Sequence, residues 1–305
     1  MIQITYNGVD ITDDVSVNRC YHDMYSGGRS DTVHLRVNDS QSLWDAWAPA
    51  AGDEIRIDYD SISTGTMFVA DTNRRNGLFD IMLQSAPESC FARQNKSWQK
   101  VRLLQIGEEI AERNGLSFHS YGVEDRLYSY LVQSDGDLRF LSRLAQMEGH
   151  SVLVYDRKLI MYSETYMEAM EPSEALTVPA DGDYKYQDRR DNLFGSCVVE
   201  SGMYRGEYSA ANGSTRVLVP DTMPVAGSNE EAGRFAKNLL RAANKECLTG
   251  YVRSEILPGY APASIVELGN AKSPSWDGRV FISHIRNDYV SGKSKIFFRK
   301  PLEGY

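Results

Sequence analysis

The residues that could do chemistry are scattered along the 305-residue chain and form no known catalytic pattern. The five histidines lack the spacing of metal ligands: His22, His34, His119, His150 and His284. The G-x-S-x-G elbow of hydrolases, the H-E-x-x-H zinc helix and the phosphate-binding glycine loops do not occur. The sequence therefore predicts no catalytic, cofactor-binding or metal-binding residue, and we expect a protein that is not an enzyme.

Two groups of carboxylates come closest to a site. The first group lies along an expected strand and its turns, at Asp53, Glu54, Asp58 and Asp60. A glycosidase would need two carboxylates that face each other across a cleft, so a solvated face is the better interpretation. The second group comprises Asp181, Asp183, Asp188 and Asp191. It lacks the ligand order and the closing Glu of a calcium loop, which indicates a polar loop instead.

Composition narrows the class of protein further. The net charge of −9 has the wrong sign for a protein that grips nucleic acid, although an acidic wall would let DNA slide past. The four cysteines contain no C-x-x-C pair, so zinc is not expected: Cys20, Cys90, Cys197 and Cys247. We expect reduced thiols, with a disulfide as the alternative. There is no secretory signal at the start and no apolar run that could span a membrane.

The first part of the chain has the alternation of antiparallel strands. Apolar residues alternate over residues 2–6, 33–37 and 55–59, and a hairpin is expected over 67–83 with its turn at 73–77. Asn7-Gly8 is a further turn signal.

A short helical turn is expected between the second and third of these strands. Ser42 can cap it, Leu43 and Trp47 would share one side, and Pro49 would end it. For Trp44 and Trp47 core packing is favoured over contact with a partner.

Three later segments have apolar residues at helical spacing: residues 99–114, 137–148 and 228–247. Ser134 or Asp135 can cap the second helix, and Gly149 can end it. Ser228 and Glu231 form a capping box at the start of the third.

Strand patterns separate and follow these helices. A hairpin is expected over 150–162 with its turn at Asp156-Arg157, and strands return over 195–219 and after Cys247. Residues 170–186 contain two prolines and an acidic turn, which is typical of a linker.

The end of the first part resembles the end of the chain. Residues 65–83 align with residues 278–298 when two residues are inserted in the turn. The alignment matches Gly65 with Gly278, Phe68 with Phe281, Val69 with Ile282 and Ile81 with Ile296. It suggests two similar antiparallel barrels in one polypeptide, although two hairpins of like pattern can also arise by chance. A trimer of such a chain would present six barrels.

The middle of the chain carries a resemblance to a known family. Residues 134–162, SDGDLRFLSRLAQMEGHSVLVYDRKLIMY, resemble the late-control-D type of phage baseplate hub and the hub portion of VgrG spike proteins. The matched features are Ser134-Asp135, the helix around 140–145, the Glu148-Gly149 stop and the strand 158–162. The helix 234–245 with the following strand entry, and SWDGRVFISHIRNDYVSGKSKIFFRK near the end, are similar to the same family.

This resemblance implies a mainly β (α+β) fold with two tail-tube-like barrels and helical insertions. The expected divisions are a first barrel over 1–95, a helix–hairpin region over 96–170 and a second barrel over 171–305. It also implies a structural hub of a contractile phage tail or phage-tail-like injection particle. The hub would be a homotrimer that joins the sixfold tail tube to the threefold spike and contacts other baseplate proteins. Its location would be the tail baseplate, assembled in the cytoplasm of a bacterial host.

Further expectations concern the assembly. The chain ends directly after the second expected barrel, so the spike and any cell-wall hydrolase should be separate proteins. The channel of the trimer is expected to be lined by acidic or neutral residues, so that cargo passes without binding. Two alternatives stay open, namely a carbohydrate- or receptor-binding tail module and a cell-wall hydrolase. The family similarity is an argument by analogy of fold.

Overall fold

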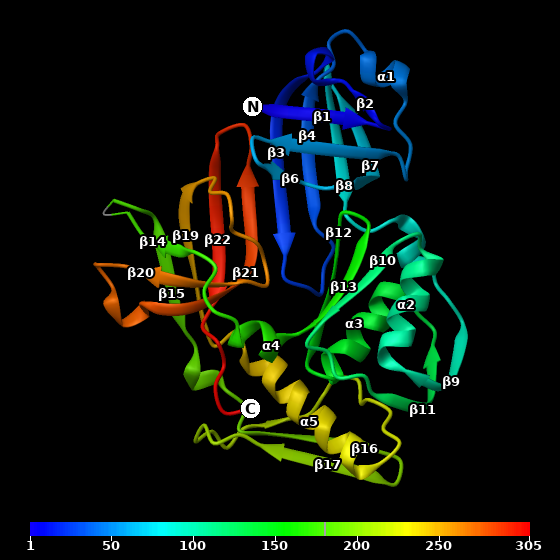
Figure 1. Cartoon of the computed structure of the whole chain (residues 1–305), viewed down its shortest axis with the longest axis vertical. Helices are drawn as coiled ribbons and strands as arrows, with labels where there is room; N and C mark the ends of the chain where they lie inside the picture. The colour runs from blue at the N-terminus through cyan, green and yellow to red at the C-terminus, as the bar shows by residue number, and fades with distance from the viewer. Residues whose placement is uncertain (180) are drawn as a thin grey trace.

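The structure, a computed structural model, describes residues 1–179 and 181–305. It is mostly β, with 44% strand and 20% helix. The largest sheet of the described residues has 14 strands in two groups, which we call the N-terminal and C-terminal lobes. Figure 1 shows the N-terminal lobe at the top and the C-terminal lobe at the left, with the longer helices lower in the view, toward the right and the bottom.

The N-terminal lobe contains β1 (Ile2–Tyr6), β2 (Val9–Asp10), β3 (Ser16–Tyr25), β4 (Thr32–Asn38), β5 (Glu54–Tyr59), β6 (Ile62–Ser63), β7 (Met67–Arg75), β8 (Leu78–Gln84) and the short helix α1 (Leu43–Trp47). The C-terminal lobe contains β14 (Ala175–Thr177), β15 (Tyr184–Asp188), β19 (Leu248–Glu255), β20 (Ile265–Gly269), β21 (Gly278–Asp288) and β22 (Lys293–Arg299). Each lobe has its own apolar core, formed by the inward residues of the alternating strands.

The two lobes have the same strand order. It runs β3-β4-β8-β7-β5-β1 in the N-terminal lobe and β15-β19-β22-β21-β20-β14 in the C-terminal lobe. The pairing differs only at the end, where β1 is antiparallel to β5 while β14 is parallel to β20. The hairpins that the sequence analysis aligned are therefore equivalent in topology.

The registers of the aligned hairpins agree residue by residue. Phe68 of β7 is opposite Gln84 of β8, and the aligned Phe281 of β21 is opposite Arg299 of β22, which aligns with Gln84. Both hairpins also contain a β-bulge at the same aligned step, after Val69 in β7 and after Ile282 in β21. A bulge adds local twist and bends the strand, so its repetition gives the two hairpins a common curvature.

The prediction of two barrels is not confirmed, because no ladder closes among the described strands and the two lobes share one open sheet. The reason is the length of β21. Its first residues pair with β20, and beyond the bulge residues 284–288 pair with β3 of the other lobe. One long strand thus joins the lobes edge to edge.

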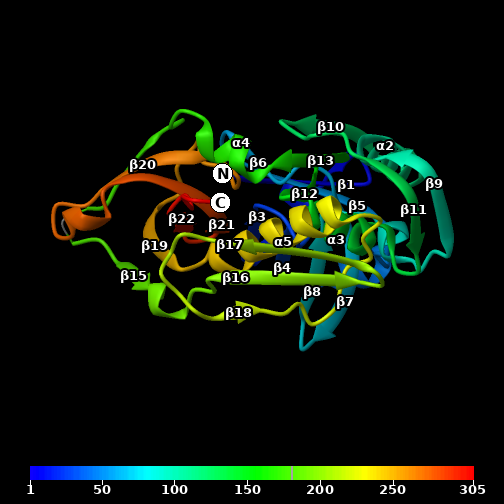
Figure 2. The same ribbon diagram turned by 90° about the horizontal axis from the view of Figure 1, so that it is seen from below.

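The middle of the chain forms a third unit with its own core. It contains β9 (Lys96–Arg102), α2 (Leu103–Arg113), β10 (Ser117–Tyr121), β11 (Leu127–Gln133), α3 (Asp137–Met147), β12 (His150–Tyr155), β13 (Lys158–Ser163) and α4 (Glu164–Ala169). An insertion between β15 and β19 adds β16 (Ser196–Ser201), β17 (Tyr204–Ser209), β18 (Val217–Leu218) and α5 (Asn229–Asn244). Figure 2 shows α5 lying over the β16–β17 pair. Short 3-10 turns occupy Thr12–Asp14, Glu88–Phe91, Arg190–Asn192 and Pro274–Trp276.

Several helix boundaries differ from expectation. The first long helix begins at Leu103 rather than near residue 99, because residues 96–102 form β9 and pair with β11. Neither Ser134 nor Asp135 caps α3, which follows Gly136 without a side-chain cap. Ser228 does cap α5, with its hydroxyl oxygen 3.1 Å from the Glu231 amide nitrogen that donates to it.

The short helix α1 and its tryptophans combine a correction with a confirmation. Ser42 makes no capping bond; instead the Asp39 carboxylate accepts a hydrogen bond from the Trp44 amide at 3.0 Å. Trp44 is buried in the N-terminal core, and Trp47 packs partly buried beside it. Core packing of Trp44, the favoured interpretation, is confirmed.

The turns follow the local signals. Asn7-Gly8 and Asp156-Arg157 both adopt positive φ and connect strands, as expected. The turn of the β7–β8 hairpin is shorter than predicted, since β7 continues to Arg75 and only Asn76-Gly77 form the turn. Their φ values of +51° and +74° suit an Asn-Gly hairpin turn.

The expected linker at residues 170–186 contributes strands to the sheet. It contains β14 and the start of β15, and residue 180 within it lies outside the described residues. No helix in the described parts of the chain is both long and apolar enough to cross a membrane.

Candidate functional site

The junction of the two lobes contains charged side chains from both of its strands. The Asp23 carboxylate of β3 accepts hydrogen bonds from Arg286 Nε at 2.8 Å and from His284 Nε2 at 2.7 Å, both on β21. Burial alone would raise the pKa of Asp23, but the bonds to His284 and Arg286 and the charge of Arg286 outweigh it and lower that pKa. The junction is therefore held by a charged cluster as well as by the backbone ladder.

The carboxyl group of Asp31 is buried close to this junction. Its Oδ1 accepts a hydrogen bond from the Tyr25 amide at 2.8 Å. Burial, with a smaller contribution from the charge of Asp23, raises the pKa of Asp31 to about 7. His22 is fully buried beside Tyr289, with 2.8 Å between Nδ1 and the phenol oxygen. Burial lowers the pKa of His22 to about 4, so the ring is neutral near pH 7.

A second charged cluster binds α4, α5 and β22 together. It comprises Glu164 and Glu168 of α4, Arg241 of α5, Arg299 of β22 and Lys245. Burial by itself would raise the pKa of Glu164, but Lys245 and Arg299 outweigh it and lower that pKa to about 2. The closest contacts are 2.5 Å from Lys245 Nζ to Glu164 Oε1 and 2.6 Å from Arg241 and from Arg299 to Glu168 Oε1. Such a buried cluster of opposite charges has a structural role.

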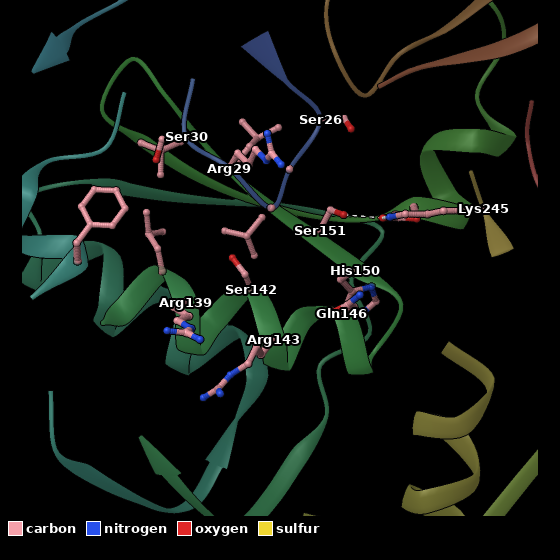
Figure 3. Close-up of a pocket in the computed structure, with 18 residues that line it drawn as sticks. Ser26, Arg29, Ser30, Arg139, Ser142, Arg143, Gln146, His150, Ser151 and Lys245 are labelled. Carbon is pink, nitrogen blue, oxygen red and sulfur yellow. Dashed lines mark hydrogen bonds and ion pairs between the residues drawn. The ribbon is translucent and has the colours of Figure 1, made fainter. Parts of the chain in front are cut away.

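A polar cavity of about 430 Å³ lies between the β3–β4 loop, α3 and β12. Figure 3 shows Ser142 of α3 pointing toward the loop that carries Arg29, while the guanidinium group of Arg143 points away. Arg143 is paired with Asp135 at 2.6 Å. Three further cations line the cavity: Arg29, Arg139 and Lys245.

The cavity lacks the geometry of a catalytic site. His150 is buried, and burial lowers its pKa, so it is the natural candidate for a base. Within the described residues, however, neither of its ring nitrogens has a hydrogen-bond partner. Ser151 donates its hydroxyl to Glu164 at 2.6 Å instead. Among the described residues that line the cavity, no serine hydroxyl is hydrogen-bonded to a histidine, as a histidine-activated serine nucleophile would require.

An apolar groove of about 420 Å³ lies between β11, α3, α5 and the loop at residues 222–225. Val132 and Val225 at its rim are 58% and 77% exposed, which is unusual for valines. Exposed apolar side chains that line one groove are typical of a surface that contacts another protein.

The carboxylates singled out in the sequence serve local structure. The Asp53 carboxylate accepts a hydrogen bond from the Tyr6 hydroxyl at 2.7 Å, Glu54 pairs with Arg157, and Asp58 pairs with Arg56. Asp60 holds the amino terminus at 2.6 Å. In the second group Asp183 pairs with Arg253 and Asp188 with Arg190, at 3.2 and 2.6 Å. No group of three or more possible metal ligands occurs among the described residues.

The histidines and cysteines are likewise dispersed. His34 lies 3.2 Å from Asp80, and His119 lies 3.3 Å from the Ser117 hydroxyl. The four cysteines are free thiols, three of them buried. The charged junction itself was missed by sequence reasoning. The sequence offered two weak signs of it. Polar and apolar residues alternate over Ser-His-Ile-Arg in β21, and Asp23 lies 261 positions from His284, too far for a local pattern to connect them.

No protein-family model and no curated protein sequence matches the chain. Solved structures do. The 43 kDa tail protein of prophage MuSo2 from Shewanella oneidensis is 11% identical, covers 97% of both chains and has a TM-score of 0.75. A tail protein from Neisseria meningitidis is 12% identical over 98% of this chain and 95% of its own, with a TM-score of 0.76.

A third similar structure comes from a secretion machine. An Escherichia coli component of the type VI secretion system is 13% identical over 99% of this chain and 78% of its own, with a TM-score of 0.62. That component is itself structurally similar to the bacteriophage T4 tail proteins gp27 and gp5. At these identities the likeness concerns the fold. The chain thus has the fold of phage tail proteins, which a component of the type VI secretion system shares.

Proposed function

We propose that this chain is a structural hub protein of a contractile phage tail or a phage-tail-like injection particle. Three copies form a ring that joins the sixfold tail tube to the threefold spike, at the baseplate of the particle. Residues 1–95 and 171–305 are the two tube-like, barrel-related units, and residues 96–170 form the middle region between them. The chain performs no catalysis, and the particle assembles in the cytoplasm of the bacterial host.

The observation that carries this proposal is the equivalence of the two lobes. Six strands follow one another in the same order in each lobe, and the β7–β8 and β21–β22 hairpins share one register, with a bulge at the same aligned step. A chain with two equivalent units can meet a sixfold partner with three copies and a threefold partner with the same three copies. A single-unit chain could match only one of these symmetries.

The partners follow from the surfaces. The apolar groove at α3 and β11 suits a neighbouring baseplate or spike protein, because its exposed valines would be covered on assembly. The net charge of −9 suits a channel wall that is acidic or neutral, past which DNA or protein cargo moves without binding.

The decisive experiment is the native mass of the purified chain, alone and co-expressed with a spike protein from the same gene cluster. A mass of three chains supports the hub, and binding of the tube protein by that trimer would establish the adaptor role. A monomer under both conditions, together with no binding of tube protein, would contradict the proposal.

A receptor- or carbohydrate-binding tail module is the second candidate. Exposed aromatic side chains favour it, including Tyr121, Tyr130 and Tyr166, each roughly half exposed. Binding of host surface glycans by the monomer, without tube or spike association, would favour this candidate. Peptidoglycan turnover by the purified chain would favour a cell-wall hydrolase, the third and weakest candidate.

A further inference from the structure

The two lobes join within the chain where the edge of β21 pairs with the edge of β3. Each lobe has an equivalent strand edge that pairs with no described strand. Beyond its bulge, β21 pairs with β3 through residues 284–288 and 21–25. By the alignment of the hairpins, residues 71–75 of β7 are equivalent to 284–288. These residues pair with β8 on one side, and among the described strands none lies on their other side. Four of the five are exposed.

The other half of the junction also has a free equivalent. β15 occupies the place in the C-terminal lobe that β3 has in the N-terminal lobe, and its described pairing is with β19 alone. The paired neighbours of each strand give the register. Cys20 is opposite Leu35, which is opposite Ile81, and likewise Tyr184 is opposite Val252, which is opposite Ile296. Because Ile81 aligns with Ile296, residues 21–24 of β3 correspond to residues 185–188 of β15.

We propose that the outer edge of β7 pairs with the outer edge of β15 of a second copy, in the register of the β3–β21 junction. The chain itself supplies the template, since the equivalent edges already pair once within each copy. Exposed strand edges are surfaces at which another chain can add a strand. In Figures 1 and 2 β15 lies at the left of the molecule and β7 toward the right, so the contact is head to tail. A head-to-tail contact generates a ring when its rotation closes.

The register places specific side chains opposite each other. Asn73 corresponds to Arg286 and Gln187 to Asp23, so the ion pair of the internal junction becomes a neutral amide pair between copies. Next to this amide pair, the negatively charged Asp71 comes opposite the positively charged Arg189. At the other end Arg75 comes opposite Lys185, where the internal junction has Asp288 opposite Tyr21. This like-charged pair lies at the end of the ladder and is exposed on both sides.

Crosslinking tests the contact directly. The Asn73→Cys/Gln187→Cys variant, treated with a short bis-maleimide, should give covalent dimers and trimers on a denaturing gel. Each single-cysteine variant should give none, and these also control for Cys247, which is partly exposed. The absence of crosslinked chains at the highest soluble protein concentration would overturn the inference. A native trimer without the crosslink would overturn it while leaving the proposed hub intact.

Charge swaps provide an independent readout. Asn73→Asp/Gln187→Asp sets two carboxylates opposite each other and should weaken self-association at least tenfold. Asn73→Arg/Gln187→Asp recreates the internal ion pair and should restore it. Gln99→Asp, on exposed β9 away from both edges, controls for added negative charge. Equal affinity of all variants would contradict the edge pairing. This inference rests on the proposed function only for the number of copies in the ring. The native mass measures that number independently of the crosslink.

Discussion

At the scale of single residues, folding changes the pKa values of buried titratable groups. Asp31 and Glu164 are both buried carboxylates, yet their pKa values move in opposite directions. Glu164 faces Lys245 and Arg299, which favour its charged form, whereas Asp31 faces a backbone amide and lies near another acid. Burial penalises a charge in both cases, and the partners decide the outcome.

Asp31 should give the chain a measurable dependence of stability on pH. Its pKa in the folded chain, about 7, lies above the usual aspartate value of 3.8, so its neutral form stabilises the fold. That contribution is complete below about pH 4 and is lost as pH rises through about 7. Asp31→Asn keeps the acceptor for the Tyr25 amide and stays neutral. Its free energy of unfolding relative to the wild type should therefore rise between pH 4 and pH 8, by at most about 4 kcal/mol.

Urea unfolding at a series of pH values measures this difference. The Asp14→Asn variant, at an exposed position, controls for the loss of one negative charge. A constant difference between Asp31→Asn and the wild type across this range would show that Asp31 is charged throughout.

At the scale of elements, the insertion helix packs very closely on the sheet beneath it. α5 crosses β17 at Gly206, where a Cβ atom would lie 1.9 Å from the Gly233 nitrogen and 2.2 Å from the Ala232 carbonyl carbon. These are backbone atoms of a helix and cannot move aside independently. Glycine at 206 is thus what lets the helix pack directly on the strand.

Two glycine-to-alanine changes at this contact should have opposite effects. Gly206→Ala overpacks the contact and should lower the free energy of unfolding by about 3 kcal/mol. Gly233→Ala, one turn inside α5, adds a Cβ with no atom within 4 Å and should raise that free energy by about 0.5–1 kcal/mol. Chemical denaturation of the two variants measures both. Equal destabilisation by the two would mean that α5 lies differently on β17.

At the scale of the whole molecule, the joined sheet makes the two lobes one mechanical unit. The contact between β3 and β21 continues the ladder of both lobes, and the Asp23 cluster adds charge-assisted bonds across it. A similar cluster occurs within one lobe, where Asp80 of β8 accepts bonds from Arg36 and His34 of β4. The Asp23 cluster and the Asp80 cluster therefore allow a matched comparison. The first joins strands of different lobes, and the second joins strands of the same lobe.

Removing each aspartate should loosen different parts of the sheet. Asp23→Ala leaves Arg286 and His284 unpaired and should cost about 2 kcal/mol, with faster amide hydrogen exchange in β3 and β21. Asp80→Ala should speed exchange in β4 and β8 and leave β21 unchanged. Hydrogen exchange read by mass spectrometry distinguishes these patterns. If Asp23→Ala left exchange in both junction strands unaltered, the cluster would not couple the lobes.

What the sequence by itself determined is local. The alternation of apolar residues, the Asn7-Gly8 turn and the Ser228 cap follow from interactions within a few residues, and the structure has them where they were expected. The similarity of the hairpins at 65–83 and 278–298 could also be read, because a common pattern of burial imposes a common pattern of residues. The sequence contains no known catalytic pattern, which favours a protein that acts through its contact surfaces.

Only the tertiary structure decided how the lobes meet. A strand pattern specifies which face is buried but not which neighbour pairs with its edge, since backbone hydrogen bonds carry no side-chain identity. The hairpin similarity and the family resemblance led us to expect two antiparallel barrels. The described strands do not confirm them, because β21 runs past its own lobe and pairs with β3. The pairing of Asp23 with residues 261 and 263 positions away depends on that long-range register, which no local signal encodes.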